Sequence, residues 1–160
     1  MCREAMNRVK LAAAYTAGAY LVDVVLRREI AAREARAYAD SVNKPMLNVG
    51  AGAPGTALFG STLYGDVNMD LGAPRVPCRP GVICHGDAHK LPFEDREFGS
   101  LLASHVLEHL DRPDRALAEW QRVADRLWVI TPSWWAPHTW LHPGHRWYFA
   151  GDGSKLALWK

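Results

Sequence analysis

"MLNVGAGAPG", residues 46–55, is the stretch of sequence that decides the fold. A short apolar run ends in glycines spaced as Gly50-x-Gly52-x-x-Gly55, the pattern of a nucleotide-binding turn, although many loops match it by chance. The pyrophosphate of a dinucleotide also needs a helix directly after this turn. The residues that follow include a proline and several further glycines, so only about two helical turns fit there. The sequence therefore disfavours a dinucleotide site, whereas a ligand with a ribose and no phosphates would not require that helix.

The rest of the chain alternates apolar strand candidates with helices or loops. Residues 71–81 hold three prolines and must form a loop, whereas residues 112–126 carry apolar residues at helical spacing. This alternation predicts an α/β, Rossmann-like three-layer sandwich, with a mostly parallel sheet of about five strands and its ligand at their carboxyl ends. The five strand candidates are "PMLNVG" (45–50), "TLYGDVNMDL" (62–71), "VICHGDA" (82–88), "FGSLLAS" (98–104) and "LWVITPS" (127–133).

A long helix is expected before this domain, over residues 5–41. Its start resembles a signal peptide, but Asp23 interrupts the apolar run and the helical pattern continues without a cleavage break. We therefore divide the chain into an N-terminal helix packed on the domain (1–44) and the domain itself (45–160). A membrane-surface or signal role for the helix is the weaker alternative. The apolar stripe expected to pack consists of Leu11, Tyr15, Val22, Leu26 and Ile30.

Composition excludes some partners. The 160 residues are 49% apolar and 22% charged with a formal net charge of +2, and basic residues alternate with acidic ones, so no nucleic-acid partner is expected. The three cysteines are Cys2, Cys78 and Cys84, without a C-x-x-C pair. Free thiols in a reducing cytoplasm are the simplest interpretation, and a Cys78–Cys84 disulfide is the alternative. We therefore expect a cytoplasmic protein.

Several motifs occur together in one order: "LNVGAG", "NMD", "GDAHKLPFED", "FGSLLASHVLEHL" and "LAEWQRV". This order resembles class I S-adenosylmethionine-dependent methyltransferases, over about residues 45–132. The resemblance implies that the chain binds S-adenosyl-L-methionine. Residues 133–160 are short for the helix and antiparallel strand pair that usually close the sheet in this family, so a sheet abbreviated at the C-terminus is expected.

The resemblance also implies a role for each of seven residues. The glycine turn would approach the methionine part of the cofactor, and the first aspartate would accept hydrogen bonds from both ribose hydroxyls, as a carboxylate can. The second aspartate and the alanine after it would contact the adenine, and the last two residues would border the sulfonium. In chain order these residues are Gly50, Gly52, Asp70, Asp87, Ala88, Ser104 and His105. Tight turns that involve only the glycines and aspartates are the alternative.

Histidines suggest a competing metal chemistry. "HVLEH" (105–109) matches the H-x-x-E-H pattern of inverted zinc proteases, which needs both histidines on one face of a formed helix. His105 falls where a strand ends, so pocket lining is the expected role for His105, and capping or packing for Glu108 and His109. His138, His142 and His145 also have metal-compatible spacing, but loop histidines of this kind usually make ordinary hydrogen bonds. No metal site is therefore predicted.

The expected reaction is in-line methyl transfer to a small-molecule acceptor. A general base is needed only for a protonated nucleophile, and His105 is the first candidate and His138 the second. The alternative is a non-catalytic, methyltransferase-like binding or scaffold subunit. An uncovered sheet edge and many tryptophans near the C-terminus further predict a homodimer or a partner subunit, contacting residues 133–160 or the N-terminal helix.

Overall fold

The structure is a computed structural model that describes residues 2–52, 63–133, 137–150 and 157–159. Its centre is a five-stranded sheet with the strand order β3-β2-β1-β4-β5, in which every neighbouring pair is parallel. The strands span Met46–Val49 (β1), Val67–Asp70 (β2), Ile83–His85 (β3), Phe98–Ser104 (β4) and Ala124–Ile130 (β5). The fold is thus Rossmann-like α/β, and the predicted parallel sheet is confirmed.

The strand order places a ligand crevice beside β1. Leu47 of β1 pairs with Val67 of β2 on one side and with Leu101 of β4 on the other. From β1 the chain runs outward to β2 and β3, and it then returns to form β4 on the opposite side. In sheets of this type, ligands bind outside the carboxyl ends of the strands at such a reversal. The glycine turn leaves β1 at this point.

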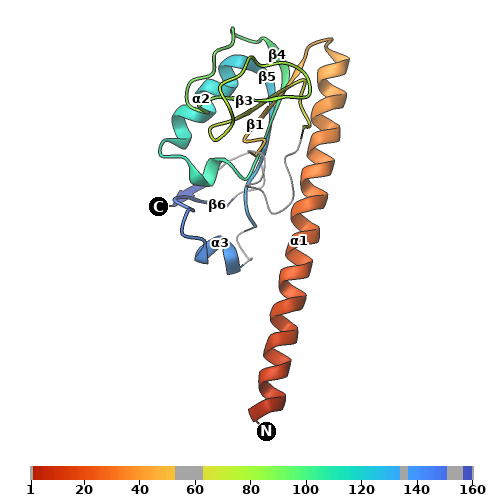
Figure 1. Ribbon diagram of the computed structural model, residues 1–160, viewed down its shortest axis with the longest axis vertical. Coiled ribbons are helices and arrows are strands. Elements are labelled where there is room, and N and C mark those ends of the chain that lie inside the picture. The colour runs from red at the N-terminus through yellow and green to blue at the C-terminus, as the bar shows by residue number, and fades with distance from the viewer. Residues whose placement is uncertain (1, 53–62, 134–136, 151–156, 160) are drawn as a thin grey trace.

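Alternating side chains of the central strands point to opposite faces of the sheet, and each face packs against one helix (Figure 1). Leu47 and Leu101 belong to the core with Trp120 of α2 (Pro113–Val123), whereas Met46 and Leu102 belong to the core on the α1 side. This period-2 pattern is what a strand produces when both faces are covered. Trp120 is fully buried and anchors α2 to the sheet.

Helix α1 spans Cys2–Ser41, so the predicted long helix is confirmed. It contacts β4, β5 and β1 through its C-terminal part, where Ala32, Ala35 and Ala39 are buried, and its N-terminal half extends away from the sheet (Figure 1). The expected packing stripe is wrong where the side chains are described, because Val22, Leu26 and Ile30 are more than half exposed. A helix of 40 residues is roughly 60 Å long, whereas a strand of seven residues covers roughly 23 Å. The sheet can therefore bury only the last turns of α1.

A tight ion pair joins the C-terminal part of α1 to the sheet. Arg36 donates to Asp66 Oδ2 at 2.6 Å and to the carbonyl of Tyr64 at 2.9 Å. Burial raises the pKa of Asp66, but the hydrogen bonds from the amide of Met46 and from Arg36 outweigh it and lower this pKa overall. This contact ties the helix to the loop before β2.

The C-terminal elements are short. They are the 3-10 helix η1 (Leu107–His109), which precedes α2, and then α3 (Pro137–Leu141), β6 (Tyr148–Ala150) and β7 (Ala157–Trp159). β6 and β7 pair antiparallel with each other in a separate sheet, so within the described residues β5 is an edge of the main sheet. The predicted helix over 112–126 ends earlier than expected, because Ala124 already pairs with Phe98 as the first residue of β5.

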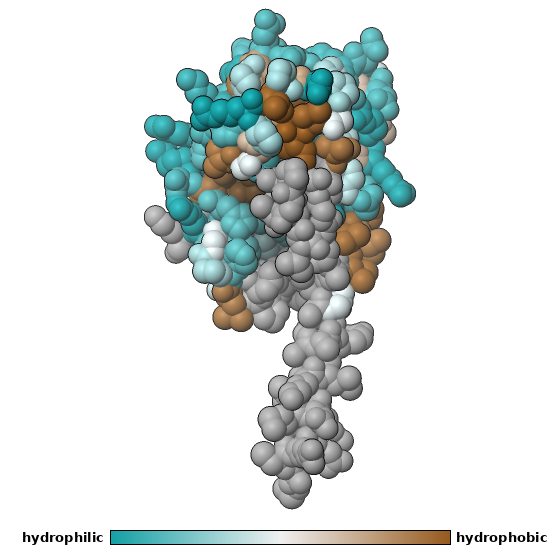
Figure 2. Space-filling model, viewed as in Figure 1, coloured by the Kyte–Doolittle hydropathy of each residue, from teal (hydrophilic) through white to brown (hydrophobic). Residues whose placement is uncertain are grey.

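Cys78 and Cys84 form a disulfide, so the expectation of free thiols at these positions is wrong. Gly81 adopts a φ of 76° between them, and this turn lets the proline-rich loop fold back onto β3. Among the described residues, none of the helices combines the length and apolar character that a membrane span requires. Figure 2 shows hydrophilic residues over much of the described surface, with separate apolar patches between them.

Candidate functional site

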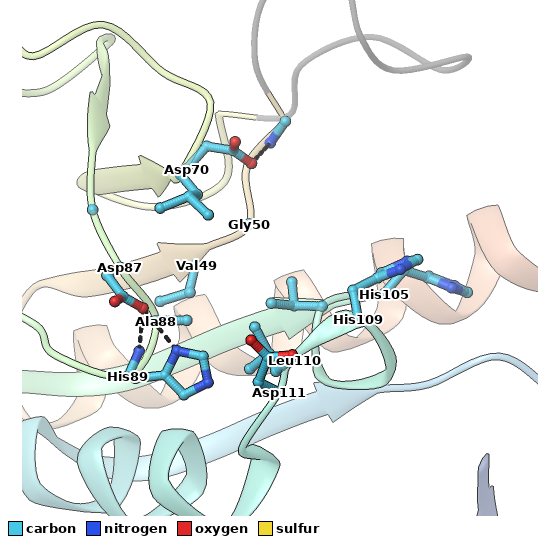
Figure 3. Close-up of a pocket in the computed structure, with 14 residues that line it drawn as sticks. Val49, Gly50, Asp70, Asp87, Ala88, His89, His105, His109, Leu110 and Asp111 are labelled. Atoms are coloured by element: carbon cyan, nitrogen blue, oxygen red, sulfur yellow. Dashed lines mark hydrogen bonds and ion pairs between the residues drawn. The ribbon is translucent and has the colours of Figure 1, made fainter. Parts of the chain in front are cut away.

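A cavity of about 650 Å³ opens at the carboxyl ends of the parallel strands. Its walls come from the turn after β1, the end of β2, the segment after β3 and the residues between β4 and α2 (Figure 3). This volume lies within the range of about 300–1,000 Å³ typical of small-molecule sites. The lining residues are Val49, Gly50, Gly52, Asp70, Leu71, Gly86, Asp87, Ala88, His89, His105, Val106, His109, Leu110 and Asp111.

The glycine turn requires glycine at its first position. Gly50 and Gly52 have φ values of 72° and 82°, in the left-handed region that side chains disfavour. A Cβ atom on Gly50 would also lie 2.1 Å from Cγ2 of Val106. The turn thus exposes its backbone to the cavity without a side chain in between. Gly55, the third glycine of the pattern, lies outside the described residues.

Asp70, the last residue of β2, orders this turn. Its Oδ2 accepts a hydrogen bond from the amide of Gly52 (2.9 Å), and its Oδ1 accepts one from the amide of Gly72 (2.8 Å). Each carboxylate oxygen has a second lone pair, so the group can still accept hydrogen bonds from a ligand. The turn-ordering alternative is therefore observed, and it is compatible with the ribose-binding role.

Asp87 follows β3 and faces the cavity mouth with about half of its side chain exposed. Its Oδ1 accepts hydrogen bonds from the amide (2.9 Å) and the Nδ1 (2.8 Å) of His89, and the amide hydrogen bond is the main reason that the pKa of Asp87 is lowered. Asp87 is therefore ionised at neutral pH. Its Oδ2 remains to accept a hydrogen bond from a ligand.

Helix α2 holds the segment that contains Asp87 in place. Trp120 donates its indole N–H to the carbonyl of Ala88 at 3.0 Å, and Glu119 accepts the amide of Leu91 at 2.8 Å. Arg122 adds hydrogen bonds to the carbonyls of Leu91 and Phe93. The wall of the cavity formed by residues 87–91 is thus fixed by the packed face of a core helix.

The residues after β4 turn sharply into the cavity. His105 adopts a φ of 57°, and its amide donates to the carbonyl of Ile130 at 2.8 Å. A non-glycine residue in this conformation is uncommon and is often found at functional sites. Ser104 does not line the cavity, and its hydroxyl is buried without a hydrogen-bond partner among the described residues. Six of the seven predicted cofactor residues thus surround one cavity, and Ser104 is the exception.

The two candidate bases are placed differently. His105 lines the cavity, whereas His138 belongs to α3 and its side chain lies outside the described part of the structure. The zinc-protease interpretation of "HVLEH" fails geometrically, because η1 begins at Leu107 and has only three residues. The sequence predicted His105 at the start of a helix, whereas it lies two residues before η1.

Glu108 is the least expected residue of the region. It is 1% exposed, and neither carboxylate oxygen has a hydrogen-bond partner in the described part of the chain. Oε1 lies 3.3 Å from Nδ1 of His105 and 3.9 Å from Nε2 of His109. Sequence reasoning assigned Glu108 only a capping or packing role, because nothing in the motif shows that its side chain turns inward.

Other lining residues were also missed from the sequence. His89 was part of a quoted motif but received no role, although its ring binds Asp87. Leu110 and Asp111 follow η1 and complete the wall opposite the aspartates. Their position depends on the short helix η1 and the turn after it, which the sequence does not reveal. Their closeness to His105 along the chain is the one feature that could have suggested a place in the cavity wall.

Comparison with known protein families agrees with this geometry. Residues 66–126 match a family described as a methyltransferase domain. The match includes Asp70, Asp87 and His105, whereas the glycine turn precedes it. No curated protein and no solved structure shows a significant match to the chain. Together with the Rossmann-like fold, the match confirms the resemblance to class I methyltransferases.

Proposed function

We propose that the protein transfers a methyl group from S-adenosyl-L-methionine to a small-molecule acceptor. The observation that carries this proposal is the cavity at the strand reversal, where the glycine turn, Asp70 and Asp87 surround one space. Residues 53–62, which follow the glycine turn, lie outside the described chain.

The residues present fit this cofactor. The backbone of the glycine turn lines the cavity, and the hydrogen-bonded carboxylates of Asp70 and Asp87 suit a ribose diol and an exocyclic amine. We assign the ribose to Asp70, the adenine to Asp87 and Ala88, and the methionine part to the glycine turn. When bound, the cofactor supplies an electrophilic methyl group. The protein contributes mainly by holding the two reactants together, an effect worth roughly 7–11 kcal/mol.

His105 is the proposed general base for an acceptor that starts protonated. Its Nδ1 lies 3.3 Å from Glu108 Oε1, so the carboxylate can hold the Nδ1 proton and leave the lone pair on Nε2. Nε2 has no hydrogen-bond partner among the described residues. In this assignment Glu108 is a positioning residue. His138 remains the second candidate.

Titration calorimetry with S-adenosylmethionine and S-adenosylhomocysteine tests cofactor binding. Asp87→Ala should weaken S-adenosylhomocysteine binding about 5- to 100-fold, the loss expected when a polar ligand group loses its partner. The matched control is Asp114→Ala, because Asp114 is exposed and pairs with Arg112 outside the cavity. Absence of binding to the wild-type protein would reject the enzymatic proposal. Binding without turnover of any acceptor would favour the alternative of a non-catalytic binding or scaffold subunit.

Self-association or a partner subunit is also proposed. Its support is the unpaired edge at β5 within the described sheet, together with exposed Val22, Leu26 and Ile30 on α1. Sedimentation at micromolar concentration should show a dimer for the wild type. Replacing these three residues with serine, or deleting residues 151–160, should shift the protein toward the monomer if the corresponding surface is used. A monomeric wild type would leave only the partner-subunit form of the proposal.

A cytoplasmic location is the remaining proposal, and the Cys78–Cys84 disulfide argues against it. Such bonds are rare in reducing compartments and persist in oxidising ones. A cytoplasmic protein should carry both residues as thiols. Alkylation in intact cells followed by mass spectrometry distinguishes the two states.

A further inference from the structure

Three histidines that are distant in the sequence converge beside the cavity. His109 follows β4, whereas His142 and His145 flank the Pro143-Gly144 turn after α3. One ring nitrogen from each lies within 4.8 Å of those of the other two. The ring centroid of His109 is 5.6 Å from that of His142 and 4.9 Å from that of His145. Three imidazoles so close together are a typical ligand set for a transition metal.

Hydrogen bonds to backbone carbonyls orient two of the three rings. Nδ1 of His109 donates to the carbonyl of Gly144 at 2.9 Å, and Nδ1 of His145 donates to the carbonyl of Thr139 at 2.8 Å. A carbonyl can only accept, so in both neutral rings the lone pair lies on Nε2. Metal-binding histidines are usually fixed in this way, with the other ring nitrogen bound to a carbonyl or carboxylate.

His142 differs from the other two histidines. Its Nδ1 accepts the amide of Gly144 at 3.1 Å, so metal binding would require this ring to turn and exchange that hydrogen bond for the metal. The side chain is exposed, which leaves room for the rotation. A tetrahedral zinc site needs ligand atoms about 3.4 Å apart. The ligand atoms, which lie within 4.8 Å of one another, therefore have to approach by up to about 1.4 Å, and the turn of this ring can supply the part that involves His142.

Glu108 provides an independent indication of a cation. Its carboxylate is buried next to His109, without a hydrogen-bond partner among the described residues. Its nearest polar contact is His105 Nδ1 at 3.3 Å from Oε1. A buried carboxylate without hydrogen bonds is costly, and binding a metal ion is one of the few ways to compensate it. Nε2 of His109, the nitrogen with the lone pair, is the atom that lies 3.9 Å from Glu108 Oε1. A cation bound to this nitrogen would also be within reach of the carboxylate.

We propose that His109, His142, His145 and Glu108 form a binding site for a divalent transition-metal ion of the zinc type. Three imidazoles and one carboxylate suit zinc, whereas calcium and magnesium prefer oxygen ligands alone. This inference replaces the expectation from the sequence that no metal is bound. The sequence grouped His142 and His145 with His138, whereas the structure groups them with His109.

The site would connect two segments that already touch. The amide of Arg146 donates to the carbonyl of Glu108, and Trp147 donates its indole N–H to the carbonyl of Leu110, both at 2.8 Å. His109 also lines the cavity, so the metal would lie in its wall. Metal binding here does not depend on the proposed methyl transfer, and either proposal can fail alone.

The test uses full-length protein without a polyhistidine tag, stripped with a chelator and titrated with zinc. We expect one zinc per chain by calorimetry and elemental analysis. His109→Ala, His145→Ala and Glu108→Gln should each weaken zinc binding by about 100-fold or more, since even residues that only orient metal ligands contribute about 10- to 100-fold. The matched control is His85→Ala, because His85 lies at the end of β3 and outside the cluster. It should bind zinc as the wild type does.

A second measurement does not depend on how the variants fold. X-ray absorption of the zinc-loaded wild type should show three nitrogen ligands and at least one oxygen ligand, and cobalt in its place should give the visible absorption of a tetrahedral site. Failure of the wild type to bind zinc stoichiometrically would overturn the proposal. So would zinc binding that His109→Ala leaves unchanged, or a spectrum with water oxygens as the main ligands.

Discussion

The two walls of the cavity are built in different ways. The aspartate wall, residues 86–91 with Asp70, sits at strand ends and is held by α2 through Trp120 and Glu119. The histidine wall, residues 105–111, is held by a short 3-10 helix and by contacts with residues 144–147. In the first wall Asp70 and Asp87 accept hydrogen bonds from the protein, although Nε2 of His89 is buried without a partner among the described residues. The second wall contains the buried carboxylate of Glu108, which has no hydrogen-bond partner in the same part of the chain. The difference indicates that the protein itself compensates the carboxylates of the aspartate wall, whereas the buried carboxylate of the histidine wall would gain more from a bound cation.

The glycine turn between the walls should show the largest mutational effect. Gly50→Ala places a side chain in the left-handed region, at about 1–2 kcal/mol, and against Val106, at about 1–3 kcal/mol more. We expect a loss of about 2–5 kcal/mol in the free energy of unfolding, measured by urea denaturation. Gly81→Ala is the matched control, because its φ is similar at 76° but a Cβ there meets nothing within 4 Å. Equal losses in the two variants would show that the contact with Val106 does not matter.

Support of the aspartate wall by α2 can be tested at Trp120. Trp120→Phe removes the buried hydrogen bond to the carbonyl of Ala88 and part of the packed ring, and should cost about 2–4 kcal/mol. It should also weaken S-adenosylhomocysteine binding, because Ala88 lines the cavity. Trp128→Phe is the control, since its indole N–H binds Glu34 at an exposed site. A similar loss of affinity in both variants would contradict a specific support of this wall.

Sequence reasoning succeeded where function depends on residues near one another along the chain. The five strands and their parallel arrangement follow from apolar runs that end at turns, whereas Asp70 and Asp87 were singled out by the resemblance to the methyltransferase family. The sequence did not reveal that α1 packs on the sheet only through small residues near its C-terminal end, because periodicity alone does not show how much of a helix the sheet can cover. Val22, Leu26 and Ile30 fit the helical repeat as well as any buried stripe does.

The cluster of His109, His142 and His145 could not be predicted for another reason. His109 and His145 are 36 positions apart in the sequence, and the geometry that joins them comes from the turn after α3. The disulfide was similarly underestimated, since spacing alone does not show that the loop folds back onto β3. In both cases the missing information is a tertiary contact between a loop and a strand end.

Substitution of Glu108 should change the stability of the fold less than the previous variants, and in the opposite direction. In metal-free protein, Glu108→Gln removes a buried carboxylate that has no hydrogen bond within the described residues and only the longer contact with His105 Nδ1 at 3.3 Å, and should stabilise the fold by about 1–2 kcal/mol. The same change should reduce the stabilisation that zinc gives to the wild type. Thermal unfolding with and without zinc measures both effects. If the metal-free variant is less stable than the wild type, the protein itself already compensates the Glu108 carboxylate. The two walls would then not differ in this respect.

The smallest expected effect concerns the pH dependence of the aspartate wall. Hydrogen bonds from the amide and ring of His89 lower the pKa of Asp87 in the folded protein below its ordinary value of about 3.9. A carboxyl group with a depressed pKa stabilises the fold above its unfolded pKa, and this contribution disappears as the pH falls through the folded pKa. The wild type should therefore lose stability at this site only below about pH 4. Since about half of the side chain is exposed, the loss should stay below about 1 kcal/mol.

Urea denaturation between about pH 3 and pH 6 should show a shallower acid slope for Asp87→Asn than for the wild type. Asp40→Asn, at an exposed position of α1, should keep the wild-type slope. If Asp87→Asn also keeps that slope, the hydrogen bonds from His89 do not distinguish the charged carboxylate, and the aspartate wall is less fixed than its contacts indicate.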